Sequence, residues 1–401
     1  MRRLDVIHRE PFLLATLIVI IAGFFSVTTF ASRAYHHKQE EFGYRWFERG
    51  EAALKRSQPR PAVDAFRNAL AYSRDNDLYR LRLAQALMAA NRPQEARAHL
   101  LSLWEKQPGD GTVNLELARL AAQWEDSRQV VRYYHAAIYG VWPDDPLPHR
   151  TEARFELSEY LLKHNDIQDA QAELVALAAN LPPNDAVGQT RLGELFLRSG
   201  LNARSLAAFR TALAAQPNAL AALAGAGEAA FRMGDYRTAR HYLLPVVAQS
   251  PQDRASQELL SISELVIKSD PFERGLRLQE RARRTVQDFA IVLAQAGRCP
   301  VAAPAPTSST TPATDAGAPA ASTASPPTAA SGTNTFPALL QKAVSMKASV
   351  KEQLLLRNPD ALYATMDVVY RMENAMPQAC APSTAEEKAM ALLAAQWEAA
   401  R

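Results

Sequence analysis

The longest uninterrupted apolar run lies close to the N-terminus. Between Glu10 and Arg33 there are 22 residues without a formal charge, PFLLATLIVIIAGFFSVTTFAS. As a helix this run measures about 33 Å, and the hydrocarbon core of a bilayer is about 30 Å thick. It is apolar on every side, apart from Ser and Thr side chains that bond back to a helix backbone, whereas a buried core helix has a polar face. The pattern predicts a transmembrane helix over 11–32, after a short tail at 1–10.

A cleaved secretory signal is the alternative interpretation of the same run. Arg2 and Arg3 precede it, and small residues flank Phe30 at the spacing that a signal peptidase reads. The apolar stretch of a signal peptide usually has about 7 to 15 residues, so we favour an uncleaved anchor. Basic residues flank the run almost equally, but their density favours a cytoplasmic N-terminal tail. The rest of the chain is then expected outside the bacterial inner membrane, in the periplasm.

A second pattern repeats every 34 residues from residue 43 onward. Segments that begin at 43, 77, 111, 151, 186 and 220 align, with six extra residues around 145–150 and one at Asp185. Small residues at the eighth position allow two antiparallel helices to approach closely, while larger ones fill the space between helix pairs. The eighth position reads Gly50, Ala84, Ala118, Ser158, Gly193 and Gly227, and the twenty-fourth reads Phe66, Leu100, Tyr134, Leu174, Phe209 and Leu243. The alignment predicts six helical hairpins over 43–253.

The expected turn of each hairpin falls at the fifteenth position. Five of the six residues there tolerate a tight turn, the exception being Glu125. The full set is Ser57, Asn91, Glu125, Asn165, Gly200 and Gly234. Four copies end in a proline, which stops a helix, at Pro108, Pro182, Pro217 and Pro251.

The repeated pattern resembles the tetratricopeptide repeat family. The clearest matches to its consensus are Trp46 with Gly50, Leu192 with Gly193, and the triplet Ala62, Phe66 and Ala69. The resemblance covers 43–253, about half of the chain, and departs from the family where Arg74 and Trp142 replace the terminal proline. It implies an all-α protein, a right-handed solenoid of helix pairs whose concave groove binds protein or peptide partners.

In this family the first helix of each pair lines the groove, mainly through its second, fifth, ninth, twelfth and thirteenth positions. The fifth position implies a mainly apolar floor, with Phe47, Leu81, Leu115 and Phe155, followed by Thr190 and Ala224. The ninth position is polar, with Glu51, Gln85, Arg119, Glu159, Glu194 and Glu228. In four copies a Glu at the ninth position precedes a Lys or Arg at the thirteenth: Lys55, Lys163, Arg198 and Arg232.

The groove carboxylates have two interpretations. They are hooks for a basic partner, or each forms an ordinary couple within its helix, worth about 0.2–0.5 kcal/mol. Since such couples neutralise the rim, we expect an amphipathic partner held by the apolar floor. No copy has the Lys and Asn pair with which some family members bind a C-terminal carboxylate. Alternatively, the anchor or the chain's own C-terminal segment covers part of this surface.

The segment 254–300 is expected to contain a long helix. Asp270 followed by Pro271 and Glu273 has the pattern of a capped helix start, and the helix would run to about Gly297. Four arginines would then lie along one face, at Arg274, Arg277, Arg281 and Arg284. Such a basic stripe would bind an anionic glycan, a lipid head group or an acidic protein, or it is a solvated face balanced by nearby carboxylates.

The segment 301–336 has six Pro, one Asp and no Lys or Arg, which predicts a disordered linker. Within 337–401 three helices are expected, at about 338–356, 360–376 and 384–400, the last with a capping box of Ser383 and Glu386. Cys299 and Cys380 lie on the two sides of the linker. A disulfide between them would close a loop of about 80 residues, for an idealised gain of about 4.5 kcal/mol, and would require an oxidising compartment. Two free thiols are the alternative.

Composition removes several classes of function. Hydrophobic residues make up 48% of the chain and charged residues 22%, as in ordinary globular proteins, and the net charge of +3 is too small for a nucleic-acid binder. Two cysteines and eight scattered histidines offer no metal-binding motif, and the sequence has no phosphate loop, GxSxG or Rossmann fingerprint.

We therefore predict no enzyme, cofactor or metal, but a membrane-anchored scaffold of the bacterial envelope. The alternative is an envelope or polysaccharide assembly factor that contacts anionic glycan or lipid through its Arg-rich helix.

Overall fold

The computed structural model describes residues 9–299 and 335–399, and within these ranges the chain is helical, without a β-strand. Backbone contacts divide the chain into two compact units, Met1–Asn180 and Leu181–Arg401. Most of the expected N-terminal tail and the expected linker, up to residue 334, lie outside the described residues.

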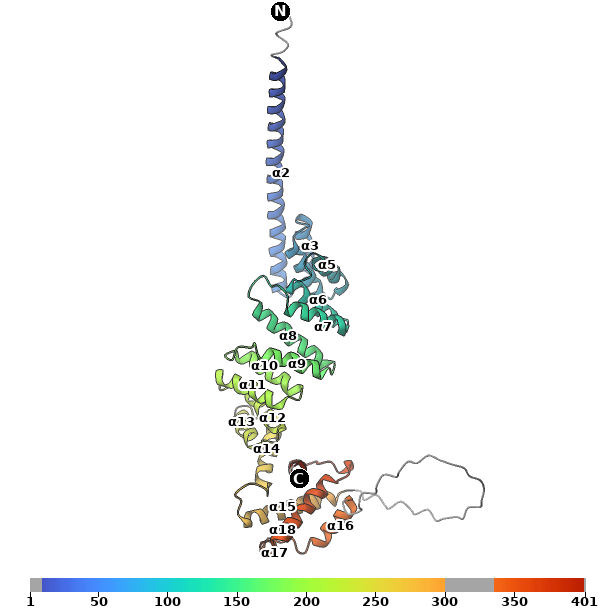
Figure 1. The fold of residues 1–401 in the computed structure, drawn as a ribbon, viewed down its shortest axis with the longest axis vertical. Helices are drawn as coiled ribbons and strands as arrows, with labels where there is room; N and C mark the ends of the chain where they lie inside the picture. The colour runs from blue at the N-terminus through green and yellow to red at the C-terminus, as the bar shows by residue number, and fades with distance from the viewer. Residues whose placement is uncertain (1–8, 300–334, 400–401) are drawn as a thin grey trace, which may run out of the picture. The chain divides into compact units, whose positions relative to one another are not determined.

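The first described helix, α2, runs without interruption over Arg9–Lys55 (Figure 1). It includes both the apolar run and the first helix of the first repeat, so no loop separates them. Side chains of the apolar part are exposed, for example Phe24 and Phe30. Within the described part of the chain, α2 is the one helix long and apolar enough to cross a membrane.

The first unit contains four hairpins, and the end of α2 is the first helix of the first one. The helices after α2 are α3 (Pro59–Tyr72), α4 (Asp77–Ala89), α5 (Pro93–Lys106), α6 (Gly111–Gln123), α7 (Ser127–Ile138), α8 (Pro146–Lys163) and α9 (Ile167–Ala178). They pair as α2 with α3, α4 with α5, α6 with α7, and α8 with α9. The extra residues at 145–150 lengthen α8 at its start, where the Asp145 carboxylate accepts a hydrogen bond from the Leu147 amide, and α8 still packs on α7.

The alternation of small and large residues has a direct packing cause. A Cβ atom on Gly50 would lie 2.5 Å from the Phe66 ring, and one on Gly193 would lie 2.7 Å from Phe209. Ala84 and Ala118, which replace glycine in two other copies, are fully buried. The helices of each pair therefore cross where one of them has almost no side chain.

All six turns between paired helices have a left-handed residue at the fifteenth position. The φ angles are 56° at Ser57, 58° at Asn91, 56° at Glu125, 63° at Asn165, 83° at Gly200 and 76° at Gly234. Glu125 adopts this conformation although its side chain does not favour it.

The second unit continues the same periodicity. Its helices are α10 (Ala186–Arg198), α11 (Asn202–Ala215), α12 (Leu220–Arg232), α13 (Tyr236–Gln249), α14 (Arg254–Ser269), α15 (Leu278–Ala296), α16 (Phe336–Met346), α17 (Glu352–Arg357), α18 (Pro359–Asn374), the short η1 (Gln378–Cys380) and α19 (Ala385–Ala399). The start of α14 lies 34 residues after that of α12, so α14 is in phase with the repeats. The core of the C-terminal part combines α15–α19 with apolar residues of α13 and α14.

Several expected boundaries in the C-terminal part are wrong. The helix expected from Asp270 begins at Leu278, because Asp270 ends α14 and the left-handed Gly275, with φ of 84°, interrupts the chain. The helix expected at about 338–356 is two helices, α16 and α17, and Phe336 belongs to α16 rather than to the linker.

The expected capping box lies one residue later than predicted. Thr384 Oγ1 accepts a hydrogen bond from the Glu387 amide, and the Glu387 carboxylate accepts one from the Thr384 amide. These bonds satisfy backbone donors at the start of α19, where Ser383 and Glu386 were expected to do so.

Candidate partner-binding groove

A row of polar side chains, joined by ion pairs and hydrogen bonds, connects the first helices of the first four repeats. We call it the polar ladder, and its members are Glu51, Arg82, Gln85, Glu116, Arg119 and Glu156, from α2, α4, α6 and α8. The Glu51 carboxylate lies 3.1 Å from Arg82 Nε, and Gln85 Nε2 donates to Glu116 Oε1 at 2.8 Å. Arg119 donates to both carboxylate oxygens of Glu156, at 2.6 and 3.0 Å, and to Glu116 at 3.0 Å. Within the ladder, the ninth-position side chains Glu51, Gln85 and Arg119 each contact the sixth-position side chain of the next repeat.

Arg119 and Glu156 form a bidentate ion pair, in which two guanidinium N–H groups donate to the two carboxylate oxygens. Hydrogen bonding to Glu156 raises the pKa of the Arg119 guanidinium further above its already high value. Tyr134 also donates to Glu156, at 3.0 Å, and burial, with the Glu156 charge, raises the pKa of this phenol. Arg119 and Tyr134 therefore remain hydrogen-bond donors to Glu156 near neutral pH.

The expected couples within single helices are formed only in part. Glu228 and Arg232 do pair within α12, at 2.6 Å. Glu51, expected to pair with Lys55, pairs instead with Arg82 on the next first helix. The sixth position of each repeat was not identified as part of the groove from the sequence. The signal was present there, because each sixth-position residue of the ladder is complementary to the ninth-position residue of the preceding repeat: Arg with Glu, Glu with Gln, and Glu with Arg.

The expected apolar floor is largely closed. Leu115 and Phe155 are only 6% and 3% exposed, and Leu115 belongs to the apolar core of the first unit. Phe47 is half-buried, with its ring 4.9 Å from that of Tyr79 and 5.7 Å from that of Phe66. Of the four large apolar residues expected on the floor, Phe47 and Leu81 are partly exposed. The expectation of an open floor is wrong for the other two, Leu115 and Phe155.

An aromatic recess opens beside α2 in the first repeat. It is a cavity of about 530 Å³, within the usual size of a ligand pocket. Three tyrosines, Tyr44, Tyr72 and Tyr79, line it together with six polar residues: Gln39, Glu40, Ser73, Arg74, Asp75 and Asn76. Tyr44 and Tyr72 are exposed, whereas Tyr79 is buried. The recess provides flat apolar faces that the closed floor does not.

Family models of the tetratricopeptide repeat match residues 53–123, 155–219 and 190–254. The chain carries tetratricopeptide repeats. No curated protein matches the sequence.

Solved structures with this repeat are also similar to the chain. YrrB, described as a tetratricopeptide repeat protein with an unusual peptide-binding site, is 16% identical with a TM-score of 0.40, and the match covers 49% of this chain and 97% of YrrB. PilF of Pseudomonas aeruginosa is 14% identical with a TM-score of 0.42, over 55% of this chain and 97% of PilF. PilW, a type IV pilus biogenesis factor, is 16% identical with a TM-score of 0.42, over 54% and 98%.

The basic stripe expected after the tetratricopeptide repeats is not formed. Arg274 and Arg277 precede α15, so only Arg281 and Arg284 are on the helix. Arg284 is largely buried and donates to the carbonyl oxygens of Ile267 and Asp270, at 3.2 and 2.7 Å, and to the Glu273 and Glu280 carboxylates. Arg281 donates to the Pro271 carbonyl at 2.9 Å. Arg281 and Arg284 therefore hold the preceding loop in place.

Three carboxyl groups are buried in the described C-terminal part, those of Asp288, Glu373 and Glu387. Asp288 is 1% exposed and accepts a 2.8 Å hydrogen bond from the Tyr370 hydroxyl. Burial raises the pKa of Asp288 to about 7, and burial also raises that of Glu373 to about 7. Within residues 9–299 and 335–399, no group of three His, Cys, Asp or Glu side chains is arranged to hold a metal ion.

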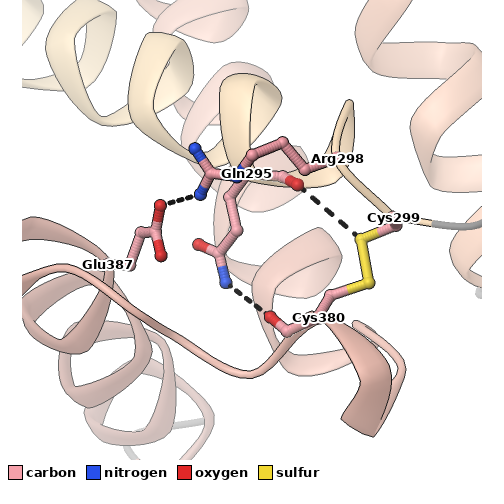
Figure 2. The surroundings of a disulfide bond; sticks show 5 residues. All are labelled: Gln295, Arg298, Cys299, Cys380 and Glu387. Atoms are coloured by element: carbon pink, nitrogen blue, oxygen red, sulfur yellow. Dashed lines mark hydrogen bonds and ion pairs between the residues drawn. A yellow bond between two sulfur atoms is a disulfide. The ribbon is translucent and has the colours of Figure 1, made fainter.

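Cys299 and Cys380 form a disulfide in the structure, with their Cα atoms 5.5 Å apart (Figure 2). Gln295 Nε2 donates to the Cys380 carbonyl at 3.1 Å, and Arg298 forms an ion pair with Glu387 at the start of α19. The end of α15 is thus joined to the segment that leads into α19.

Proposed function

We propose that the chain is a non-enzymatic scaffold, anchored in the bacterial inner membrane by α2, whose tetratricopeptide groove binds protein or peptide partners on the periplasmic side. The observation that carries the proposal is the polar ladder, which holds four first helices in one register and leaves Arg82 and Arg119 each 39% exposed in their side chains. A fixed row of donors and acceptors of this kind recognises the polar groups of a peptide.

The continuity of α2 supports a groove held close to the membrane surface. Ten residues of helix, 33–42, or about 15 Å, separate the end of the apolar run from the first repeat. An uninterrupted helix transmits the orientation of the anchor to the first hairpin, because no loop lies between them. The scaffold then presents its groove to partners that are in the membrane or near it.

The partner that fits this groove has aromatic or apolar side chains at one end and polar ones along the rest. The aromatic recess accepts the apolar side chains, and Phe47 and Leu81 extend this surface. The ladder bears both charges, so it selects a partner by hydrogen-bond pattern rather than by net charge. Periplasmic placement agrees with the Cys299–Cys380 disulfide, because such bonds persist in oxidising compartments.

Site-specific photocrosslinking in native membranes tests this function. A photoreactive residue at Gln85, in the groove, is expected to capture a defined protein, whereas one at Ala98, exposed on the second helix of the same repeat, is not. Arg119→Met is expected to reduce the capture at Gln85, and the same set of products at both positions would contradict the proposal. A reporter fused after Arg401 tests topology: cytoplasmic activity would contradict the periplasmic placement.

The alternative function was an assembly factor that binds anionic glycan or lipid through an Arg-rich helix. The positions of the arginines do not support it. Arg284 is used internally and Arg274 and Arg277 lie outside α15. We therefore retain the scaffold as the proposed function.

A further inference from the structure

The helix α14 has the position of a first helix in a seventh repeat, but its partner is not the helix that follows it. Counting from Arg254 as the first position, its ninth, twelfth and thirteenth positions are Ile262, Leu265 and Val266. These correspond to the groove positions of the other repeats. In α14 they are apolar, whereas the ninth position of α10 and of α12 is a glutamate.

The groove positions of α14 are covered by the C-terminal helix of the same chain. Ile262 and Val266 are buried, and they belong to one core cluster with Met390, Leu393 and Ala394 of α19. Helices α14 and α19 pack directly against each other. By contrast, Glu194 and Arg198, at the ninth and thirteenth positions of α10, are exposed.

No second repeat helix covers the eighth-position face of α14 in the described part of the chain. In each of the six repeats the eighth position is small and buried against the second helix. In α14 this position is Ser261, and it is exposed. Helix α19 therefore lies on the groove side of α14 and does not replace a missing second helix.

Polar contacts orient α19 along this groove. Lys388, near its start, forms an ion pair with Glu258, which is at the fifth position of α14. Near its end, Gln396 Nε2 donates to the Gly234 carbonyl at 3.3 Å, in the turn between α12 and α13. Met390, Leu393 and Ala394 fall between these two contacts at helical spacing.

We propose that α19 is a tethered internal ligand, which occupies the groove at α14 and keeps other helices out of it. This inference rests on the proposed function, since it assigns to the groove at α14 a ligand class: a short helix with Ala, Met and Leu on its buried face and a lysine near its start. A tethered segment has an effective concentration on the order of 1 mM, so a free helix of similar affinity competes poorly with it.

Binding of a labelled peptide of residues 383–399 to the purified full chain in detergent tests the proposal. In a Leu393→Asp chain, whose own α19 docks poorly, the peptide is expected to bind at least about 100-fold more tightly than to the wild-type chain. A Lys388→Glu peptide should bind this variant about two- to fivefold more weakly, and adding Glu258→Lys to the chain should restore its binding. Equal binding to the wild-type and Leu393→Asp chains, or no response to charge reversal, would overturn the proposal.

Hydrogen exchange keeps the proposal testable if Leu393→Asp does not fold. Glu258 and Lys388 are at the surface, so Glu258→Lys and Lys388→Glu leave the core intact. Each is expected to raise amide exchange in α19 about two- to fivefold while α11 is unchanged, and the double variant should restore protection. Unchanged protection in both single variants, or protection that depends on protein concentration, would overturn the proposal. The purified chain needs no partner, so failure here is distinct from failure of the crosslinking experiment.

Discussion

Replacing Asp288 by asparagine should make the C-terminal part more stable above neutral pH. The Asp288 carboxyl is 1% exposed and has its pKa raised to about 7 by burial, from an ordinary value of 3.8. Between about pH 4 and pH 7 the folded chain therefore keeps a proton that the unfolded chain has lost. The free energy of unfolding must fall as pH rises through this window and level off above it.

The size of the effect follows from the difference between the two pKa values. At 1.36 kcal/mol per pKa unit, it reaches about 4 kcal/mol above pH 7. An asparagine does not ionise, and its side-chain oxygen can accept the hydrogen bond that Tyr370 donates to Asp288. At pH 8 the Asp288→Asn variant should be the more stable by a few kcal/mol, and near pH 4 the two proteins should be similar.

Amide exchange of peptides from α15 and α18, measured from pH 5 to pH 9 and corrected for intrinsic rates, reports the opening free energy of this part directly. Glu373→Gln should remove a second pH-dependent contribution, because burial also raises the Glu373 pKa to about 7. Glu386→Gln, at an exposed position of α19, is the matched control and should leave the slope unchanged. The reasoning is refuted if Asp288→Asn keeps the wild-type slope or is less stable than wild type at pH 8.

Three further predictions concern stability, each measured by chemical or thermal unfolding. Glu125→Gly should stabilise the first unit by about 1 kcal/mol, since Glu125 is left-handed with φ of 56°, and a loss of stability would contradict the assigned turn. Gly193→Ala should destabilise the second unit by about 1–3 kcal/mol because its Cβ would lie 2.7 Å from Phe209, and Phe209→Leu in the same chain should recover part of the loss. The double variant Cys299→Ser with Cys380→Ser should lower the free energy of unfolding by up to about 4.5 kcal/mol, because the disulfide joins residues 81 positions apart. Mild reduction of the wild-type chain is the control, and the double variant should lose no more stability than the reduced wild type loses.

The sequence alone determined the features that depend on neighbours along the chain. The 34-residue period located the paired helices, because the size of a side chain at a helix crossing is limited locally. It also located the turns, since the second residue after each first helix adopts positive φ, and this holds even for Glu125. The apolar run was visible as a candidate span for the same reason: a helix of that length is defined by its own residues.

Packing between distant segments sets which helix faces are covered and which side chains or helices cover them. The partner of Glu51 is Arg82 rather than Lys55, because this contact depends on the next helix in the stack, and Phe155 is buried rather than open. The covering of Val266 by α19 joins segments more than a hundred residues apart. Helical periodicity assigns a residue to a face of its own helix, but contacts between distant segments also depend on packing geometry and on competition among apolar surfaces, which no local spacing records.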